Sequence, residues 1–248
     1  MITRTIPELS VVVPVKNEAE NILPLLEEIH TVLQGRVEFE VVYVDDGSDD
    51  ATPQILAQAK LLHPRLRVVR HRASCGQSQA VATGVKHASG LLVGTLDGDG
   101  QNDPADLPAM LECWRALPEA DQPLAMITGW RATRRDNGIR RLSSKVANGI
   151  RSKLLNDGTP DSGSGIKILP RALFLDLPRF DHMHRFMAAL IIRAGGRVEV
   201  VRVNHRPRER GISKYGVWNR LWVGIVDLFG VMWLMRRARN PVVDGQAE

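Results

Sequence analysis

Short apolar runs alternate with longer amphipathic segments through the first half of the chain. The apolar runs at 9–15, 39–44, 66–70, 91–96 and 125–129 predict buried strands of a parallel sheet. The segments between them begin near residues 17, 52, 78 and 106 and repeat their apolar residues at helical spacing. Strands that alternate with helices imply a doubly wound, mostly parallel sheet. We therefore expect an α/β fold of the Rossmann-like type.

The pattern is less regular after residue 130. Residues 140–155 predict a basic helix, 163–169 a strand, 186–194 a helix and 198–203 a β-branched strand. No linker rich in Pro, Gly or Ser divides the chain. We therefore expect one domain over residues 1–215, followed by a separate helical segment.

The last segment, residues 216–248, has a pattern of its own. Charged residues interrupt it at Arg220 and Asp227, and Arg236, Arg237 and Arg239 follow it. This is typical of an amphipathic helix that lies in a membrane interface, with Trp anchors and a cationic end. A helix packed on the protein's own core or on a partner subunit gives the same pattern, so both interpretations stay open. The apolar residues at helical spacing are Trp218, Leu221, Trp222, Ile225, Phe229, Met232 and Trp233.

Composition narrows the class of partner. The chain has 248 residues, 44% of them hydrophobic, which allows one large domain with a substantial core. The net charge of +5 is concentrated in 131–151 and 193–239 and favours phosphorylated substrates or anionic lipid. Aromatic residues make up only 5%, so we expect no nucleic acid partner. Cys75 and Cys113 lack metal-type spacing and are expected to be free thiols in a reducing, cytoplasmic compartment. We expect neither a signal peptide nor a transmembrane span.

Two carboxylates stand one residue apart, directly after the apolar run 91–93. Asp97 and Asp99 are expected near the carboxyl edge of the sheet, where open α/β sheets bind their ligands. With the amide oxygen of Gln101 they offer the hard oxygen ligands that suit Mg²⁺ or Mn²⁺, which can then hold a diphosphate. The same triplet alone is also common in solvated turns and helix caps, so its position matters more than its composition.

Polar residues follow two other predicted strands in the same way. They are 14–18 and 45–48, with Pro14 and Glu18 in the first and Asp46 in the second. The first could simply cap a helix, and the second could be a turn. In a parallel sheet, however, these segments and 97–99 lie along one edge. Together they indicate a nucleotide-diphosphate site.

These motifs resemble those of family 2 glycosyltransferases with the GT-A fold. The match rests on Val12–Glu18, Val44–Thr52 and Asp97–Gln101. Three further elements resemble the dolichol-phosphate mannosyltransferase-like, polyprenyl-phosphate branch: Gln101–Pro104, Gly129–Arg131 and His205–Gly216. The resemblance covers roughly residues 8–237. Lys16 stands where an aromatic residue is common, which puts base stacking there in doubt. Gly98 stands where Ala is usual, a change we interpret as harmless.

The resemblance assigns roles by position. Residues 1–130 would form the nucleotide-sugar half and 131–215 the acceptor half. Asp97, Asp99 and Gln101 would hold the divalent ion. The nucleotide sugar would be bound by Pro14, Lys16, Glu18, Asp46, Asp97 and Gln101, and the acceptor phosphate by Arg140, Ser144 and Ser213. The catalytic residues would be Asp99, Arg131, Arg208 and Lys214, of which Arg208 and Lys214, with Ser213, would lie on a loop that closes over the site.

The resemblance also implies a reaction. It is an inverting, metal-dependent transfer of a sugar from a nucleotide diphosphate to a polyprenyl phosphate at the cytoplasmic face of the membrane. Mannose carried by GDP is the first expectation and a UDP-sugar is its main rival; a homo-oligomer is compatible with the sequence. Three alternatives are a saccharide or protein acceptor, a non-catalytic module that binds nucleotide sugar or membrane, and nucleotidyl transfer. The intact Asp97, Asp99, Gln101, Arg131 and Lys214 argue against an idle module.

Three other positions carry reactive side chains. Asp161 either contacts the sugar or acceptor channel or belongs to a turn before a strand. His182 and His184 stand two residues apart and would not face each other on a helix, which argues against a zinc pair. For His184 and Arg185 we expect packing or contact with the acceptor phosphate. Cys75 has no partner that would make it a nucleophile, so a structural thiol is expected.

Overall fold

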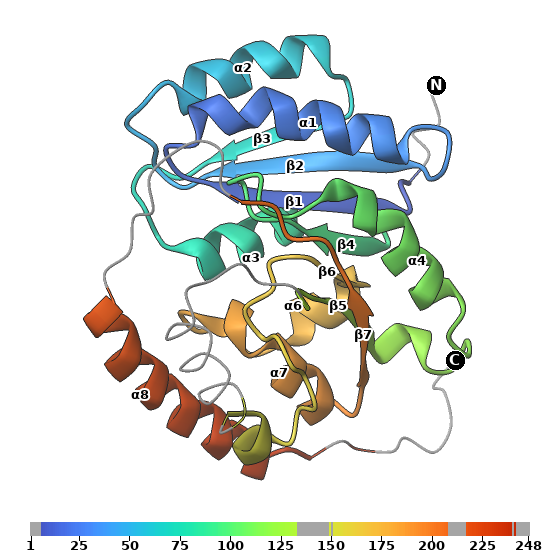
Figure 1. Cartoon of the computed structure of the whole chain (residues 1–248), viewed down its shortest axis with the longest axis vertical. Coiled ribbons are helices and arrows are strands. Elements are labelled where there is room, and N and C mark those ends of the chain that lie inside the picture. The colour runs from blue at the N-terminus through green and yellow to red at the C-terminus, as the bar shows by residue number, and fades with distance from the viewer. Residues whose placement is uncertain (1–5, 133–148, 150, 208–216, 240, 242–248) are drawn as a thin grey trace.

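The structure is a computed structural model that describes residues 6–132, 149, 151–207, 217–239 and 241, and the side chains of 217–223 are not described. One seven-stranded sheet runs through the chain in the order β3-β2-β1-β4-β6-β5-β7 (Figure 1). Its strands are β1 (Leu9–Val15), β2 (Phe39–Asp45), β3 (Leu66–Arg70), β4 (Leu92–Thr95), β5 (Ala125–Trp130), β6 (Lys167–Pro170) and β7 (Arg197–Arg202). Strand β6 is antiparallel to β4 and β5, and the other neighbouring pairs are parallel. The predicted single, mostly parallel α/β domain is confirmed.

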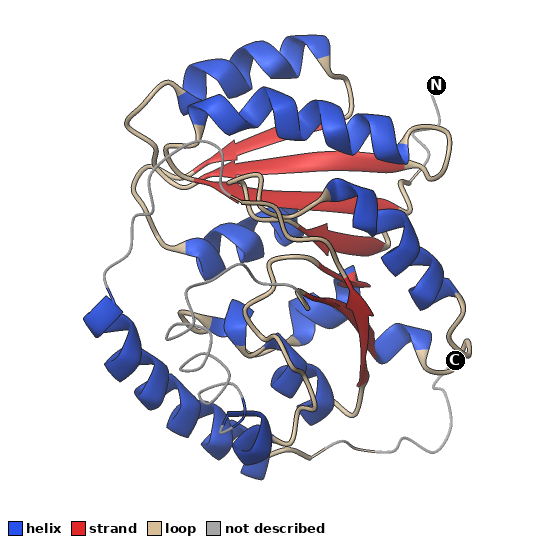
Figure 2. Cartoon of the chain, viewed as in Figure 1, coloured by secondary structure: helices blue, strands red, loops and turns tan. Residues whose placement is uncertain are grey.

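Helices cover both faces of the sheet (Figures 1 and 2). On one face, α1 (Ala19–Leu33), α2 (Thr52–Leu62) and α4 (Leu107–Arg115) bury Ile22, Leu26, Leu56 and Met110 in one core cluster. On the other, α3 (Gln77–His87), α6 (Arg171–Asp176) and α7 (Met187–Arg193) contribute to a second cluster. The small residues of α3 let it approach closely, and a Cβ on Gly84 would stand 2.4 Å from Val12 Cγ1.

The connection of the strands fixes the position of the site. Helix α1 leaves β1 on one face of the sheet, and α3 precedes β4 on the other. The carboxyl ends of β1 and β4 are therefore neighbours at the point where the strand order reverses. Such a switch point is where doubly wound sheets bind their ligands.

The predicted strand at 163–169 is wrong in its first half, because the strand is confined to Lys167–Pro170. Residues 161–165 instead form a tight turn that packs on the end of β4. A Cβ on Gly165 would lie 2.1 Å from Asp97 Oδ2, so no side chain fits at this point of the turn. Helix α6 follows the strand directly and was not predicted.

Helix α8 (Val217–Arg236) has two different faces. Val231 is buried with Phe186 and Ala189 of the segment around α7, and Leu228 and Met232 pack against them. Val226, Phe229 and Trp233 are 67%, 65% and 59% exposed. Packing on the protein's own core, one of the two interpretations of this helix, therefore accounts for one face only. Among the helices of the described residues, none is long and apolar enough to cross a bilayer.

Candidate active site

The first two polar segments are joined by hydrogen bonds at the edge of the sheet. Asn17 N donates to Ser48 Oγ over 2.9 Å, and Glu18 N donates to Thr52 Oγ1 over 3.0 Å. Asn17 has a left-handed backbone with φ of 51°, which turns the chain from β1 into α1. Pro14 and Glu18 are half-buried here, whereas Lys16 is exposed. The predicted meeting of strand ends is confirmed.

Asp46 organises the loop between β3 and α3. Its carboxylate accepts hydrogen bonds from Ser74 Oγ at 2.8 Å, Cys75 N at 2.8 Å and Gly76 N at 2.9 Å, and lies 2.7 Å from His71 Nδ1. Burial alone would raise the pKa of Asp46, but these hydrogen bonds hold it below its ordinary value. Asp46 is therefore an ionised anchor whose immediate role is to shape the loop beside the edge.

The ligand atoms of Asp46, His71 and Cys75 lie within 4.8 Å of one another, close enough to consider a metal ion. His71 already uses both ring nitrogens, the second lying 2.9 Å from Thr83 Oγ1, and Cys75 Sγ donates to Ala73 O over 3.3 Å. We interpret this group as a hydrogen-bonded network rather than a metal centre.

Asp97 lies deep in the site, directly beyond β4. Gln77 Nε2 donates to its Oδ1 over 2.7 Å, and its own backbone N donates to Asn102 Oδ1 over 2.8 Å. Burial and the neighbouring charge of Asp99 raise the pKa of Asp97 to about 6, although Lys167 and Arg131 act in the opposite direction. Gly98 also has no room for a methyl group, since a Cβ would stand 2.4 Å from Val15 Cγ1. In this chain an Ala at that position would force a shift, and the harmlessness of Gly98 stays a prediction.

Asp99 and Gln101 share one turn, in which Gln101 N donates to Asp99 Oδ1 over 3.1 Å. Asp99 lines a cavity of about 370 Å³ together with Asn21, Glu28 and Arg206. Asp97 does not line that cavity but a different one, so the two carboxylates of this turn line two separate cavities. The oxygens of Asp99, Gln101 and Glu28 are the hard donors that Mg²⁺ and Mn²⁺ prefer, so the residues fit such an ion in kind.

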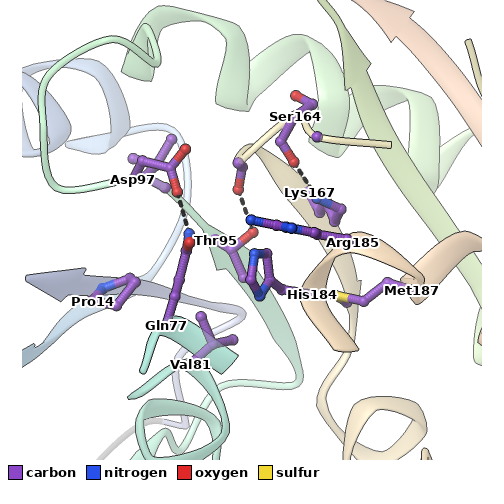
Figure 3. A pocket seen from close by; sticks show the side chains of 13 residues that line it. Pro14, Gln77, Val81, Thr95, Asp97, Ser164, Lys167, His184, Arg185 and Met187 are labelled. Atoms are coloured by element: carbon purple, nitrogen blue, oxygen red, sulfur yellow. Dashed lines mark hydrogen bonds between the residues drawn. The ribbon is translucent and has the colours of Figure 1, made fainter. Parts of the chain in front are cut away.

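The second cavity, of about 210 Å³, lies between β4, α3 and the segment before α7 (Figure 3). Gln77, Asp97, Lys167 and His184 gather around it. Lys167 is 5% exposed, and burial lowers its pKa to about 8 despite the nearby Asp97. Burial, together with Arg185 and Lys167, lowers the pKa of His184 to about 3, so this imidazole is neutral near pH 7. Its Nδ1 lies 2.7 Å from Ser78 Oγ.

Lys167 reaches the edge because β6 runs against its neighbours. In register it stands opposite Thr95 of β4 and Thr128 of β5. The first residue of an antiparallel strand thus lies where the parallel strands end. Three residues that line these cavities or touch Asp97 were not predicted as site residues: Lys167, Gln77 and Glu28. For Lys167 there was a signal, because a lysine inside the apolar run Ile166–Leu169 is hard to bury without a purpose.

Arg131 is bound by Asp161 in a two-pronged ion pair. Its Nε lies 2.7 Å from Asp161 Oδ2 and its Nη2 lies 2.8 Å from Asp161 Oδ1, with both side chains less than one-tenth exposed. The pair ties the end of β5 to the turn that touches Asp97. Asp161 therefore lies in a turn before a strand, which was one of its two interpretations. That turn also borders the smaller cavity, described above.

The segment 204–207 runs along the turn that contains Asp99. Arg206 N donates to Gln101 O over 3.0 Å, and its guanidinium pairs with Glu28 at 2.6 Å and Asp103 at 2.5 Å. Asn204 Nδ2 adds a hydrogen bond to Asp103 Oδ2 of 3.0 Å. This stem leads directly into the predicted loop residues. Arg208, Ser213, Lys214, Arg140 and Ser144 lie outside the described residues, as does most of the predicted helix 140–155.

Comparison with known proteins agrees with this geometry. Residues 10–177 match the model of a family described as glycosyl transferase family 2. A dodecaprenyl-phosphate galacturonate synthase from Rhizobium johnstonii is 34% identical over 94% of this chain and 69% of its own length. An undecaprenyl-phosphate 4-deoxy-4-formamido-L-arabinose transferase from Edwardsiella ictaluri is 31% identical over 86% of this chain and 65% of its own length.

Solved structures are similar in fold. A mannosyltransferase from Pyrobaculum calidifontis, in complex with GDP-Man and Mn²⁺, has a TM-score of 0.66 at 24% identity, covering 95% of this chain and 66% of that one. Glucosyl-3-phosphoglycerate synthase from Mycobacterium tuberculosis, with Mn²⁺, UDP and glucosyl-3-phosphoglycerate, has a TM-score of 0.66 at 18% identity, covering 95% and 81%.

Proposed function

Because the chain belongs to glycosyl transferase family 2, we propose that it transfers a sugar from a nucleotide diphosphate sugar to a polyprenyl phosphate. The observation that carries this proposal is a pair of cavities lined by the acidic turn after β4, one by Asp99 and the other by Asp97. Two cavities lined by one acidic turn suit a donor whose diphosphate and sugar bind in different places. The names of the two relatives support the lipid acceptor.

Leaving-group charge is the main demand of this reaction. The diphosphate gains negative charge as the glycosidic bond breaks, and preorganised positive charge stabilises that change. Asp99 and Gln101, with Asp97 behind them, would hold a Mg²⁺ or Mn²⁺ ion, which supplies Lewis-acid stabilisation of the diphosphate when bound. Arg208 and Lys214 would approach the diphosphate from the stem held by Arg206, and Arg131 supports the site through its pair with Asp161.

The acceptor needs no strong general base. A phosphate monoester has a second pKa of about 6 and is already an anion near neutral pH. The repulsion between the acceptor phosphate and the donor diphosphate must instead be offset. We assign this role to Arg140, Ser144 and Ser213, the residues that the family resemblance implies. Direct attack on the anomeric carbon inverts its configuration, so NMR of the product should show the opposite anomer. A retained anomer would contradict the single-step mechanism.

The donor sugar is the finer part of the proposal. Mannose was the first expectation, but the two relatives are named for galacturonate and for 4-deoxy-4-formamido-L-arabinose. GDP and UDP both remain candidates, since solved structures of similar fold hold one or the other. We therefore treat mannose as one candidate sugar among several.

The reaction would take place at the inner face of the membrane, with α8 as the contact. Its outer face presents Val226, Phe229 and Trp233, and Arg236 and Arg237 stand at its end. Exposed apolar side chains beside arginines match an interface of acyl chains and anionic headgroups.

The test is transfer to undecaprenyl phosphate in mixed micelles from GDP- and UDP-sugars, with Mg²⁺, Mn²⁺ or EDTA, and detection of the lipid-linked sugar. We expect one donor family to be used, EDTA to abolish transfer, and Asp99→Asn to reduce kcat at least about 100-fold. Glu112→Asn, on the exposed side of α4, is the matched control. No product from any donor would contradict the proposal. Nucleotide-sugar binding without transfer would favour the non-catalytic module.

A further inference from the structure

We infer that the 210 Å³ cavity holds the transferred sugar, and that Lys167 and Arg185 make it selective for a sugar that carries a carboxylate, a hexuronic acid. The inference rests on the proposed function and specifies its donor.

The size of the cavity fits one ring. Pockets that enclose a whole drug-sized ligand run from about 300 to 1,000 Å³, so a cavity of about 210 Å³ holds only part of a nucleotide sugar. Asp97 lines it, whereas Asp99, two residues along the chain, lines the larger cavity. A donor whose diphosphate sits at Asp99 would therefore place its sugar, and not its base, beside Asp97.

Neutral hydrogen-bonding groups cover part of the wall. Gln77, Thr95 and the neutral His184 line it, which suits the hydroxyl groups of any hexose. Ser164 also belongs to the wall, and its buried Oγ finds no hydrogen-bond partner among the described residues. A buried hydroxyl without a partner is costly, so a ligand atom that bonds to it would be favoured.

The cationic groups distinguish this cavity from a pocket for a neutral sugar. Lys167 donates to Ser164 O, and Arg185 lines the same wall. The wall thus carries two cationic side chains, Lys167 and Arg185, against the one carboxylate of Asp97. A further anion at this wall would therefore be stabilised. A carboxylate at C6 of the sugar supplies one negative charge within the reach of a single ring.

Matched donors test the inference. UDP-galacturonate and UDP-galactose differ only at C6, as do UDP-glucuronate and UDP-glucose, and the GDP-linked equivalents serve if the enzyme uses GDP. We expect kcat/KM to favour the uronate at least about tenfold in one pair. Arg185→Met should bring that ratio close to one, and Lys167→Met should do the same if it folds. Arg179→Met, an exposed arginine outside the cavity, should leave the ratio unchanged.

The outcomes separate the inference from the function on which it rests. Transfer of a neutral sugar at least as fast as its uronate, with a ratio that Arg185→Met does not change, overturns the inference and leaves the proposed function intact. A higher KM for the lipid phosphate, equal for both donors, would assign Lys167 and Arg185 to the acceptor and also overturn it. No transfer from any donor overturns both.

Discussion

Asp97 is held between opposing electrostatic demands. Burial and Asp99 disfavour its charge, whereas Lys167, Arg131 and the hydrogen bond from Gln77 favour it, and the balance raises its pKa to about 6. A carboxyl whose folded pKa lies above its unfolded value of about 3.9 binds its proton more tightly in the folded state. It therefore supports folding at low pH, and that contribution is lost as the pH rises from about 4 to about 6.

The stability of the protein should therefore depend on pH through Asp97. Over pH 4–6 the free energy of unfolding of the wild type should fall relative to that of Asp97→Asn, by on the order of 2–3 kcal/mol. Urea unfolding of both proteins at several pH values measures the difference. Lys167 stays protonated in this window, so its titration does not interfere. Asp176→Asn, at an exposed position, should run parallel to the wild type. If the free energies of unfolding of Asp97→Asn and the wild type change in parallel with pH, the pKa of Asp97 is not raised.

At the scale of elements, the stem at 204–207 couples β7 to the acidic turn after β4. Arg206 alone joins three places: Gln101 through its backbone, and Glu28 of α1 and Asp103 through its guanidinium. The side chain is about one-third exposed, so its ion pairs add little to stability. Their consequence is positional, because the predicted loop residues Arg208 to Lys214 begin two residues later.

Arg206→Ala should therefore lower kcat roughly 10- to 100-fold, since small displacements of catalytic groups are costly. The melting temperature should change little. Arg65→Ala removes a comparable exposed pair with Glu38, far from the site, and should leave kcat unchanged. Steady-state kinetics with saturating donor and lipid acceptor provide the comparison. Unchanged kcat in Arg206→Ala would show that the stem does not position the loop.

Elements that depend on local sequence were predicted, and features that depend on contacts between distant parts of the chain were not. The β-branched runs and the spacing of Ile22, Leu25, Leu26, Ile29 and Leu33 identified β1 and α1 because burial acts on each segment by itself. The start of β6 at Lys167, and not at residue 163, escaped prediction because the turn before it packs against a residue far away in the chain, with Gly165 against the carboxylate of Asp97. Lys167 and Gln77 were missed for the same reason. Their place in the site follows from strand order and direction, which local periodicity does not contain.

For the whole molecule, α8 decides how the site is presented to a membrane. It lies at the opposite end from α2, and its outer face is apolar while its inner face packs near α7 (Figure 1). His182 Nδ1 lies 3.1 Å from Asp227 Oδ2, which ties the helix to the segment that carries His184. A bilayer that binds the outer face of α8 would therefore contact a helix that is hydrogen-bonded to the segment lining the smaller cavity.

Phe229→Ser with Trp233→Ser should weaken binding to vesicles that contain anionic phospholipid by at least about 100-fold, given about 1.5–3 kcal/mol for each large apolar side chain buried. Vesicle sedimentation measures it. Leu61→Ser with Leu62→Ser removes two leucines that are 85% and 77% exposed on α2 and should bind like the wild type. If both double variants sediment equally with vesicles, the outer face of α8 is not the membrane contact.

The reversed direction of β6 has a consequence for how donor preference can change. The groups assigned to the nucleotide and its metal stand on segments that leave the sheet, after β1, β2 and β4. Lys167 and the turn before it stand on a segment that enters the sheet. If the cavities are assigned as proposed, the nucleotide diphosphate and the sugar are bound by different segments of the chain. Each segment can then be replaced without the other. Grafting residues 161–185 from a relative, a segment that includes both Lys167 and Arg185, would then transplant the choice of sugar while the host keeps its choice of base.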